Sequence, residues 1–369
     1  MMLPRSIPPA LALIGLAGML VTLFIDPHAL LVSYLAAVVA CSAIPIGALA
    51  VLMIGYLIRG RWTEGLHAPL TAAALTMPLA GLLLVPVLIG IPWLYPWGQQ
   101  AAGAPGSLKA IYLTPWFFAI RTIIYFLIWS MLATLVRRSW TDATRMIAVA
   151  SAGLILYALT ASLAGVDWLE SLTPEFHSSI YGLLFLTFQI LGGFAFALAV
   201  DLWRPHAPTF SYGSILLSAL LLWAYIHAMQ YIIIWSGNIP DEVIWYLRRE
   251  SGGWGVMLWS LVLLQFVLPF FAMLSGNVRN GRESLLAIAI LTVALRFVEA
   301  LLLALPGSGA AGLILALTIP ATVLGAGALW WLAFRLVFRH VQSSAHDMRP
   351  LGDAFDLTGT TLTDSQRPS

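Results

Sequence analysis

Long runs of hydrophobic residues, separated by shorter polar connections, recur along the 369-residue chain. About 20 consecutive apolar residues are enough for a helix to cross the hydrocarbon core of a bilayer. The pattern therefore predicts ten membrane-spanning helices, at residues 10–25, 30–58, 69–91, 113–136, 143–164, 178–200, 212–235, 253–274, 284–305 and 312–338. We expect an all-α polytopic membrane protein in which successive helices run in opposite directions.

Composition agrees with this pattern. Hydrophobic residues make up 60% of the chain and charged residues only 9%, and the mean hydropathy is +0.92, far from the values of soluble domains. The first apolar run is followed by Asp26, Pro27 and His28 and lacks a small-x-small cleavage site, which predicts a retained anchor helix within residues 1–28. Polar residues without apolar periodicity predict a disordered cytoplasmic tail at residues 341–369.

The basic residues predict an orientation, because Lys and Arg favour the cytoplasmic side of membrane proteins. With the N-terminus in the cytoplasm, thirteen of the eighteen basic residues fall on that side. Only Lys109, Arg248 and Arg249 fall on the outer side, while Arg121 and Arg296 lie within spans. An even number of helices then returns the C-terminus to the cytoplasm.

Two of the predicted outer connections, at residues 165–177 and 236–252, are rich in acidic and aromatic residues. Such residues suit a surface on which a partner protein docks, although solvated loops that only join helices are the alternative. The candidate residues for partner docking or quinone binding at this outer face are Asp167, Trp168, Glu175, His177, Tyr181, Asp241 and Glu242.

Four ionisable residues are predicted to lie inside the membrane. Arg296 and Glu299 are one turn apart and share a helix face. At about 1.5 Å per residue, Arg121 and His227 each lie roughly 12 Å below the outer end of their spans. Charges at this depth cost about 2.5–3.5 kcal/mol each on insertion scales, so they need a partner or a function.

These four residues predict a polar site or a proton half-channel that opens outward. The candidate inner relays are Gln189, Gln230 and Gln265. The alternative is that each group is satisfied separately, with Arg121 reaching the outer interface, His227 bonded to a carbonyl, and Arg296 paired with Glu299 as a structural ion pair.

The chemistry-bearing motifs of redox proteins are missing from the sequence. Cys41 is the only cysteine, so the chain has no covalent haem site and no thiolate set for an iron–sulfur cluster. His227 is the only histidine deep within a span, which argues against a haem held by two histidines. No Walker A sequence, dinucleotide fingerprint or H-E-x-x-H zinc motif occurs, and we expect no metal site and no nucleic-acid partner.

Four blocks of the sequence resemble one family, the second large membrane subunit of alternative complex III. The family is also called quinone-binding subunit 2 of quinol:cytochrome c oxidoreductase. The blocks are Arg59-Gly60-Arg61-Trp62 through Leu94-Tyr95-Pro96-Trp97, Phe118-Ala119-Ile120-Arg121 through Ile128-Trp129, Asp167-Trp168-Leu169-Glu170 with Ser179-Ile180-Tyr181-Gly182, and Trp223-Ala224-Tyr225 through Trp245-Tyr246-Leu247-Arg248-Arg249. The resemblance covers about residues 34–303.

The resemblance implies a fold related to the polysulfide-reductase (NrfD-like) membrane anchor. It implies two four-helix bundles, at residues 29–164 and 165–305, with a final helix at 306–340. It also implies partners: multihaem and monohaem cytochrome c subunits, an iron–sulfur subunit, a second NrfD-like membrane subunit and a haem–copper terminal oxidase. Haems and iron–sulfur clusters would belong to those partners, leaving quinone or quinol as the ligand of the membrane part.

We therefore expect an integral membrane subunit of a respiratory quinol-oxidising electron-transfer complex, in the cytoplasmic membrane of a bacterium. In that family the other large subunit is favoured as the main quinol site, and this one is assigned a role in proton passage. The chain itself would be a non-redox subunit without a cofactor of its own. Two alternatives remain: a proton-coupled secondary transporter, which also places ionisable residues at depth, and a purely structural scaffold subunit.

Overall fold

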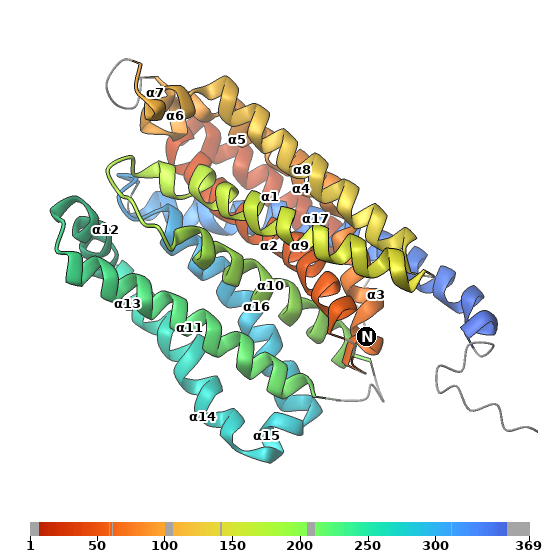
Figure 1. The fold of residues 1–369 in the computed structure, drawn as a ribbon. Coiled ribbons are helices and arrows are strands. Elements are labelled where there is room, and N and C mark those ends of the chain that lie inside the picture. The colour runs from red at the N-terminus through yellow and green to blue at the C-terminus, as the bar shows by residue number, and fades with distance from the viewer. Residues whose placement is uncertain are drawn as a thin grey trace, which may run out of the picture.

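The computed structural model describes residues 7–58, 60, 62–99, 106–140, 142–204, 211–310 and 312–352. In these ranges, nine helices are long and apolar enough to cross a membrane, and one bent pair of helices brings the number to ten. The predicted all-α polytopic membrane fold is confirmed (Figure 1). The spans are α1 (Ile7–Ile25), α2 (Pro27–Leu57), the bent pair α3 (Trp62–Ala74) with α4 (Met77–Leu83) and α5 (Val85–Ile89), α8 (Pro115–Arg138), α9 (Ala143–Trp168), α10 (Tyr181–Leu202), α11 (Tyr212–Gly237), α13 (Gly252–Val262) continued by η3 (Leu263–Val267) and α14 (Leu268–Leu274), α16 (Arg282–Ala304) and α17 (Leu313–Gly352).

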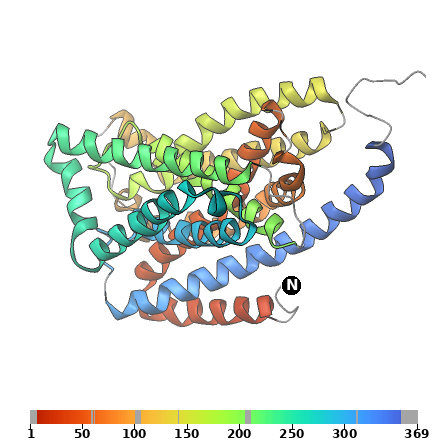
Figure 2. The same cartoon turned by 90° about the horizontal axis from the view of Figure 1, so that it is seen from below.

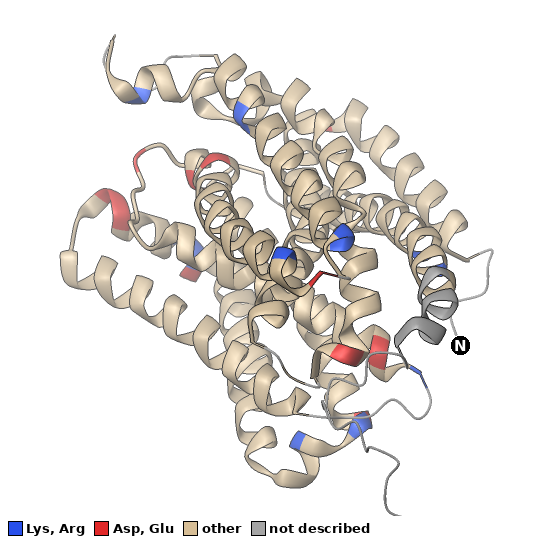
Figure 3. Ribbon diagram, turned by 45° about the vertical axis from the view of Figure 1, so that its right-hand side comes forward, with Lys and Arg blue, Asp and Glu red and all other residues tan. Residues whose placement is uncertain are grey.

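Shorter helices lie in the connections. At one end of the molecule, which we call the α12 end, these are α6 (Ile91–Leu94), η1 (Pro96–Gly98), α7 (Leu108–Tyr112), η2 (Glu170–Leu172) and α12 (Pro240–Glu250). At the opposite end, called the α15 end, α15 (Gly276–Asn280) joins α14 to α16 (Figure 1). The charged residues are concentrated towards these two ends, and few lie along the middle of the helices (Figure 3).

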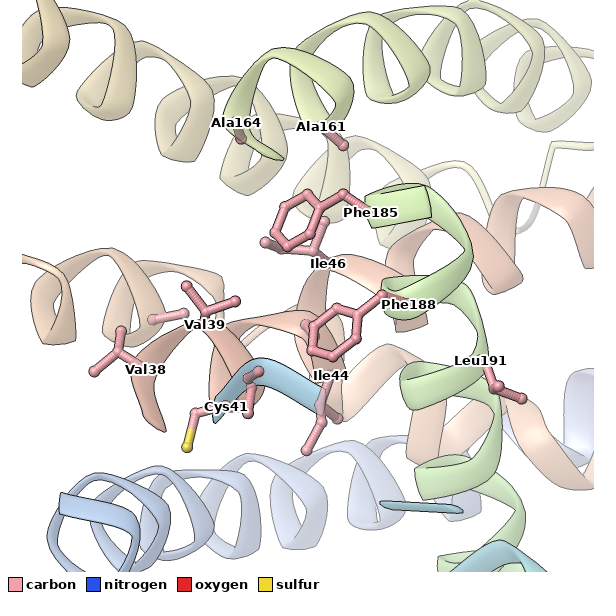
Figure 4. Packing of buried hydrophobic residues seen from close by; sticks show 14 of the residues in the cluster. Val38, Val39, Cys41, Ile44, Ile46, Ala161, Ala164, Phe185, Phe188 and Leu191 are labelled. Atoms are coloured by element: carbon pink, nitrogen blue, oxygen red, sulfur yellow. The ribbon is translucent and has the colours of Figure 1, made fainter. Parts of the chain in front are cut away.

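Helix α2 forms the centre of the fold. It is apolar on every side, which is the pattern of a helix surrounded by protein, and 94% of its most apolar stretch is buried. Helices α3, α9, α10, α16 and α17 all pack against it. Figure 4 shows Phe185 and Phe188 of α10 directed towards Ile46 and Ile44 of α2.

Glycines allow α2 and α10 to cross at very short range. A Cβ atom on Gly47 would lie 1.7 Å from the carbonyl oxygen of Gln189, and one on Gly193 would lie 2.2 Å from the nitrogen of Ala48. Any larger residue at either position would force the two backbones apart. Small residues at such crossings are typical of membrane helix packing, where van der Waals contact drives association.

Helix contacts run both within and between the two sets of helices that were predicted as bundles. Helices α2, α3, α4, α8 and α9 form one group of contacts, and α10, α11, α13, α14 and α16 form the other. The two groups share a large interface, because α2 also packs against α10 and α16. Helices α1 and α17 lie side by side, and α17 also packs against α2 and α3 (Figure 2).

The third span is broken where a proline prevents a continuous helix. Its two halves meet at a 40° bend between Ala74 and Met77. Pro78 lies in the first turn of α4, where its missing N–H is tolerated. At the bend, Thr76 Oγ1 donates to the carbonyl of Ala73 at 2.6 Å and accepts from Trp330 Nε1 of α17 at 2.9 Å.

Three predicted boundaries are wrong. Helix α9 continues to Trp168, and the predicted loop at 236–252 contains the helix α12. The tail was predicted to start at residue 341, but α17 continues to Gly352. Polar residues can extend a helix beyond the membrane, and no Gly or Pro interrupts residues 328–349. Residues 353–369 of the predicted tail, and Arg5, Arg59, Arg61 and Arg367 of the basic set, lie outside the described residues.

Candidate functional site

The candidate site is centred on the carboxylate of Glu299, in the half of α16 nearer the α12 end. Trp223 Nε1, from α11, lies 3.0 Å from Oε1 and 3.1 Å from Oε2 and donates to both. His227 Nε2, one turn further along α11, lies 3.0 Å from Oε1. An ionised carboxylate only accepts hydrogen bonds, so His227 carries a hydrogen on Nε2. Two helices far apart in the sequence therefore hold one buried carboxylate.

Arg296 supplies the counter-charge. It precedes Glu299 by one turn, and its Nη1 forms an ion pair with Glu299 Oε2. Both side chains are 1% exposed. The guanidinium also faces the rings of Phe188 and Trp223, with Cζ 5.5 Å and 5.3 Å from the two centroids. Each charge offsets much of the desolvation cost of the other, which neither would tolerate alone.

Most of the hydrogen-bonding capacity of Arg296 is unused by the described residues. Nε, Nη1 and Nη2 are all buried, and none makes a well-directed hydrogen bond there, although Nη1 is within ion-pair distance of Glu299. A guanidinium has five N–H donors, and buried polar groups are nearly always hydrogen-bonded in native proteins. Arg296 therefore has donors available to a further acceptor, which a purely structural ion pair would not need.

Polar side chains continue along the same face of α16 towards the α15 end. Thr292 lies one turn before Arg296 and is buried. Gln265 Nε2 donates to Thr292 Oγ1 at 3.3 Å. Gln265 is in the π-helical segment η3, and π-helical turns occur frequently at functional sites. We call the set Gln265, Thr292, Arg296, Glu299 and His227 the polar column.

The polar column reaches the protein surface at His227, whose side chain is 26% exposed. The other four members are almost completely buried. Of the other two predicted relays, Gln230 is buried on α11, one turn after His227, and Gln189 accepts a hydrogen bond from Tyr157 at 3.0 Å. Among the described residues, no hydrogen bond joins either of these glutamines to the polar column.

Arg121 belongs to a separate site. It makes a two-pronged ion pair with Asp167 of α9, with Nε 3.0 Å from Oδ2 and Nη2 2.8 Å from Oδ1. Its Nη1 donates to the carbonyl of Tyr112 at 2.9 Å, and Tyr125 donates to Asp167 at 2.9 Å. The structure therefore brings together three of the four predicted ionisable residues, and it pairs the fourth elsewhere. The side-chain nitrogens of Arg121 and the carboxylate oxygens of Asp167 all have hydrogen-bond partners, as expected for a purely structural ion pair.

Lysine at position 121 should not replace the arginine fully. An ammonium is a point charge and cannot make the two parallel N–H···O bonds of a guanidinium. Arg121→Lys should lower the free energy of unfolding by about 1–3 kcal/mol, read as a lower midpoint of thermal unfolding in detergent. Arg145→Lys, at an exposed position on α9, is the matched control. Equal midpoints for the two variants would show that the two parallel hydrogen bonds from Arg121 to Asp167 contribute nothing to stability.

A third buried cation, Arg249, was assigned to an outer loop by the sequence. It is 3% exposed, and its Nε and Nη2 donate to the carbonyls of Leu302 and Leu303, each at 2.8 Å. Its guanidinium also stacks on Trp245, 3.3 Å from the ring centroid. Burial lowers the pKa of Arg249 to about 9, so it stays charged at neutral pH. Arg249 thus fastens α12 to the end of α16, where the helix dipole favours a cation.

The remaining outer-face candidates divide by exposure. Glu175, His177 and Asp241 are exposed and Glu242 is half-buried. Asp167, Trp168 and Tyr181 are completely buried, so they are not part of a docking surface. The two connections are joined by aromatic packing, since the rings of Phe176 and Trp245 stack with centroids 4.7 Å apart.

No protein-family model and no curated protein sequence matches this chain. In the part of the chain that the structure describes, no group of three or more His, Cys, Asp or Glu side chains is arranged to hold a metal ion. The helices define a multi-pass integral membrane protein. The polar column, with a carboxylate at its centre, is the feature of this protein that calls for a function.

Proposed function

We propose that this chain is a membrane subunit of a respiratory complex that oxidises quinol and passes electrons to cytochrome c or to a terminal oxidase. The proposal rests on the resemblance of four sequence blocks to the second large membrane subunit of alternative complex III. Within that role, the polar column is part of a proton path. The electron carriers would be the haems and iron–sulfur clusters of partner subunits, and the membrane would be the cytoplasmic membrane of a bacterium.

One observation carries the proton-path part of the proposal. The Glu299 carboxylate is buried at the centre of the polar column, and its partner His227 reaches the surface. A carboxylate and an imidazole in direct hydrogen bonding can pass a proton along that bond, and both side-chain types act as general acids and bases in proteins. The unused donors of Arg296 are available to a further acceptor on the path.

The alternative of a transporter is less well supported by the observed hollows. One hollow, of about 520 Å³, is lined by Glu250, Gly255, Trp259 and their neighbours, and another, of about 390 Å³, lies between α9 and α10. Neither is lined by a member of the polar column. A transporter would need its buried charges to line the substrate site near the middle of the membrane.

The proposed function predicts haem-bearing partners. A tagged copy of the full chain, purified in mild detergent from the membranes of its own cells, should bring with it subunits that show c-type haem absorbance. The chain separated from these subunits should be colourless, because its single cysteine cannot form a covalent haem site. A chain that purifies alone would contradict the proposed assembly. Haem retained by the separated chain would contradict the assignment of the haems to partner subunits.

The orientation is tested by reporter tags. Fusions at the N-terminus and after Ser369 should report the cytoplasm, and an insertion at Ala102 should report the outer side. The reason is the excess of basic residues on one side of the predicted spans. Termini on opposite sides would show that the bent pair of α3 with α4 and α5 does not cross the membrane.

A further inference from the structure

A hollow with both polar and apolar walls lies between α9 and α10 at the α12 end. Its volume is about 390 Å³. Side chains from the last turns of α9 form one wall, and the segment before α10 forms the other. The lining residues include Ser162, Leu163, Val166, Glu170, His177 and Ser178.

Glu170 is an acidic side chain that lines this hollow. It is 8% exposed, and its one hydrogen bond among the described residues comes from the backbone N–H of Ser178 to Oε1, at 3.0 Å. The ion pairs of the described chain do not include it. It also follows the C-terminal end of α9, where the helix dipole adds negative potential. A buried carboxylate at such a place favours a cation with N–H donors.

A basic side chain contacts one of the residues that line the hollow. Lys109 Nζ of α7 lies 3.5 Å from Nε2 of His177 and donates to the carbonyl of Pro174. Because the lysine ammonium has only donors, His177 accepts at Nε2. Lys109 retains a further N–H donor for an anionic group next to His177. The hollow therefore has an acidic side chain in its lining and a basic side chain in contact with that lining.

An apolar strip leads away from the hollow along the helices. Leu159 is 61% exposed, and Leu163 and Leu183 are each 44% exposed. Leu163 is also part of the hollow's lining. Leu159 and Leu163 are one turn apart on the same face of α9, which points them to the same side. A molecule with a polar head in the hollow would have its apolar part lying against these leucines.

We propose that this hollow is a binding site for an aminophospholipid of the phosphatidylethanolamine type. The primary ammonium binds the Glu170 carboxylate, the phosphate lies beside Lys109 and His177, and the acyl chains follow Leu159, Leu163 and Leu183. A zwitterionic head has a cationic and an anionic group, which suit an acidic side chain and a basic side chain, and the site lies at the helix ends, where lipid headgroups meet a membrane protein. The site is independent of the polar column and of its proposed role.

The test compares headgroups on the purified full-length protein by native mass spectrometry. Dioleoyl phosphatidylethanolamine, phosphatidylcholine and phosphatidylglycerol are added in turn to the wild type and to Glu170→Gln. The wild type should retain the ethanolamine lipid in preference to the other two. The variant should bind it at least about tenfold more weakly, because a charge-assisted hydrogen bond contributes that much, with little change for phosphatidylcholine.

Two further variants separate the parts of the proposal. Glu175→Gln, in the same connection but exposed and outside the hollow, should bind like the wild type. Lys109→Gln should weaken all three lipids alike, because it removes a contact to the shared phosphate. Three results would overturn the proposal: no headgroup preference in the wild type, equal binding by Glu170→Gln and Glu175→Gln, or glycerophosphoethanolamine, which lacks acyl chains, binding as tightly as the lipid.

Discussion

Replacing Arg296 by methionine should destabilise the protein by about 3–5 kcal/mol, which is the usual effect of removing one partner of a buried ion pair. The variant leaves the Glu299 carboxylate 1% exposed with no counter-charge, and only Trp223 and His227 remain to hydrogen-bond it. Glu299 should respond by taking up a proton. The midpoint of thermal unfolding in detergent measures the loss, and Arg248→Met, at an exposed position, is the control.

The double variant Arg296→Met with Glu299→Gln should recover most of this stability. It removes both charges and keeps groups of similar size, and a neutral replacement of a buried ion pair is often close to neutral in energy. The difference between the double variant and the sum of the single variants gives the coupling between the two side chains. Additive effects, or a double variant less stable than Arg296→Met, would contradict the assignment of a coupled buried pair.

The second large effect is expected on proton movement. In the double variant the side chain at position 299 can still accept a hydrogen bond from Trp223, but it can no longer release or take up a proton. A positioned acid or base contributes roughly 10²–10⁴-fold to the rate of a step that it serves. If the polar column carries protons, the assembled double variant should therefore lose proton movement at least tenfold. If the pair is only structural, the double variant should recover both the assembly and the activity that Arg296→Met loses.

The fold was largely predictable because each membrane-spanning helix needs a long run of apolar residues, which can be seen directly in the sequence. The ten apolar runs correspond to the observed spans, and the all-round hydrophobicity of α2 fits its position at the centre. The bend in the third span was harder to predict from the sequence. Pro78 was a hint that this span is interrupted, because proline removes a helical hydrogen bond. Helix α12 was missed, because eleven residues between two spans look like a loop.

A signal for α12 was nevertheless present in the sequence. Pro240 begins it, Asp241 and Glu242 lie in its first turn, and Arg248 and Arg249 lie in its last turn. Proline at the start, acids near the N-terminus and bases near the C-terminus are the pattern that complements a helix and its dipole. These charges were interpreted as a docking loop. The structure instead buries one of them, Arg249, against the end of α16.

The candidate site was only partly predictable, because sequence gives depth along a helix but not direction around it. Arg121 and Glu299 were placed at similar depth, yet they lie on α8 and α16, which do not pack closely against each other in the described part of the chain. The partner of Arg121 was hidden by a boundary error, since α9 was expected to end before Asp167 and in fact includes it. In contrast, the pairing of Arg296 with Glu299 follows from their spacing within one helix. The contact with His227 depended on how α11 and α16 are placed by α10, against which both pack, and no local pattern specifies that placement.

The central claim is tested most directly by proton movement in the purified complex, reconstituted into sealed vesicles that contain a pH-sensitive dye. Quinol and an electron acceptor are added, and the wild type is compared with the assembled Arg296→Met, Glu299→Gln double variant at equal haem content. Our account predicts a dye response in the wild type and at least a tenfold smaller response in the double variant. An assembled double variant with unchanged quinol turnover and an unchanged dye response would remove Glu299 from the proton path.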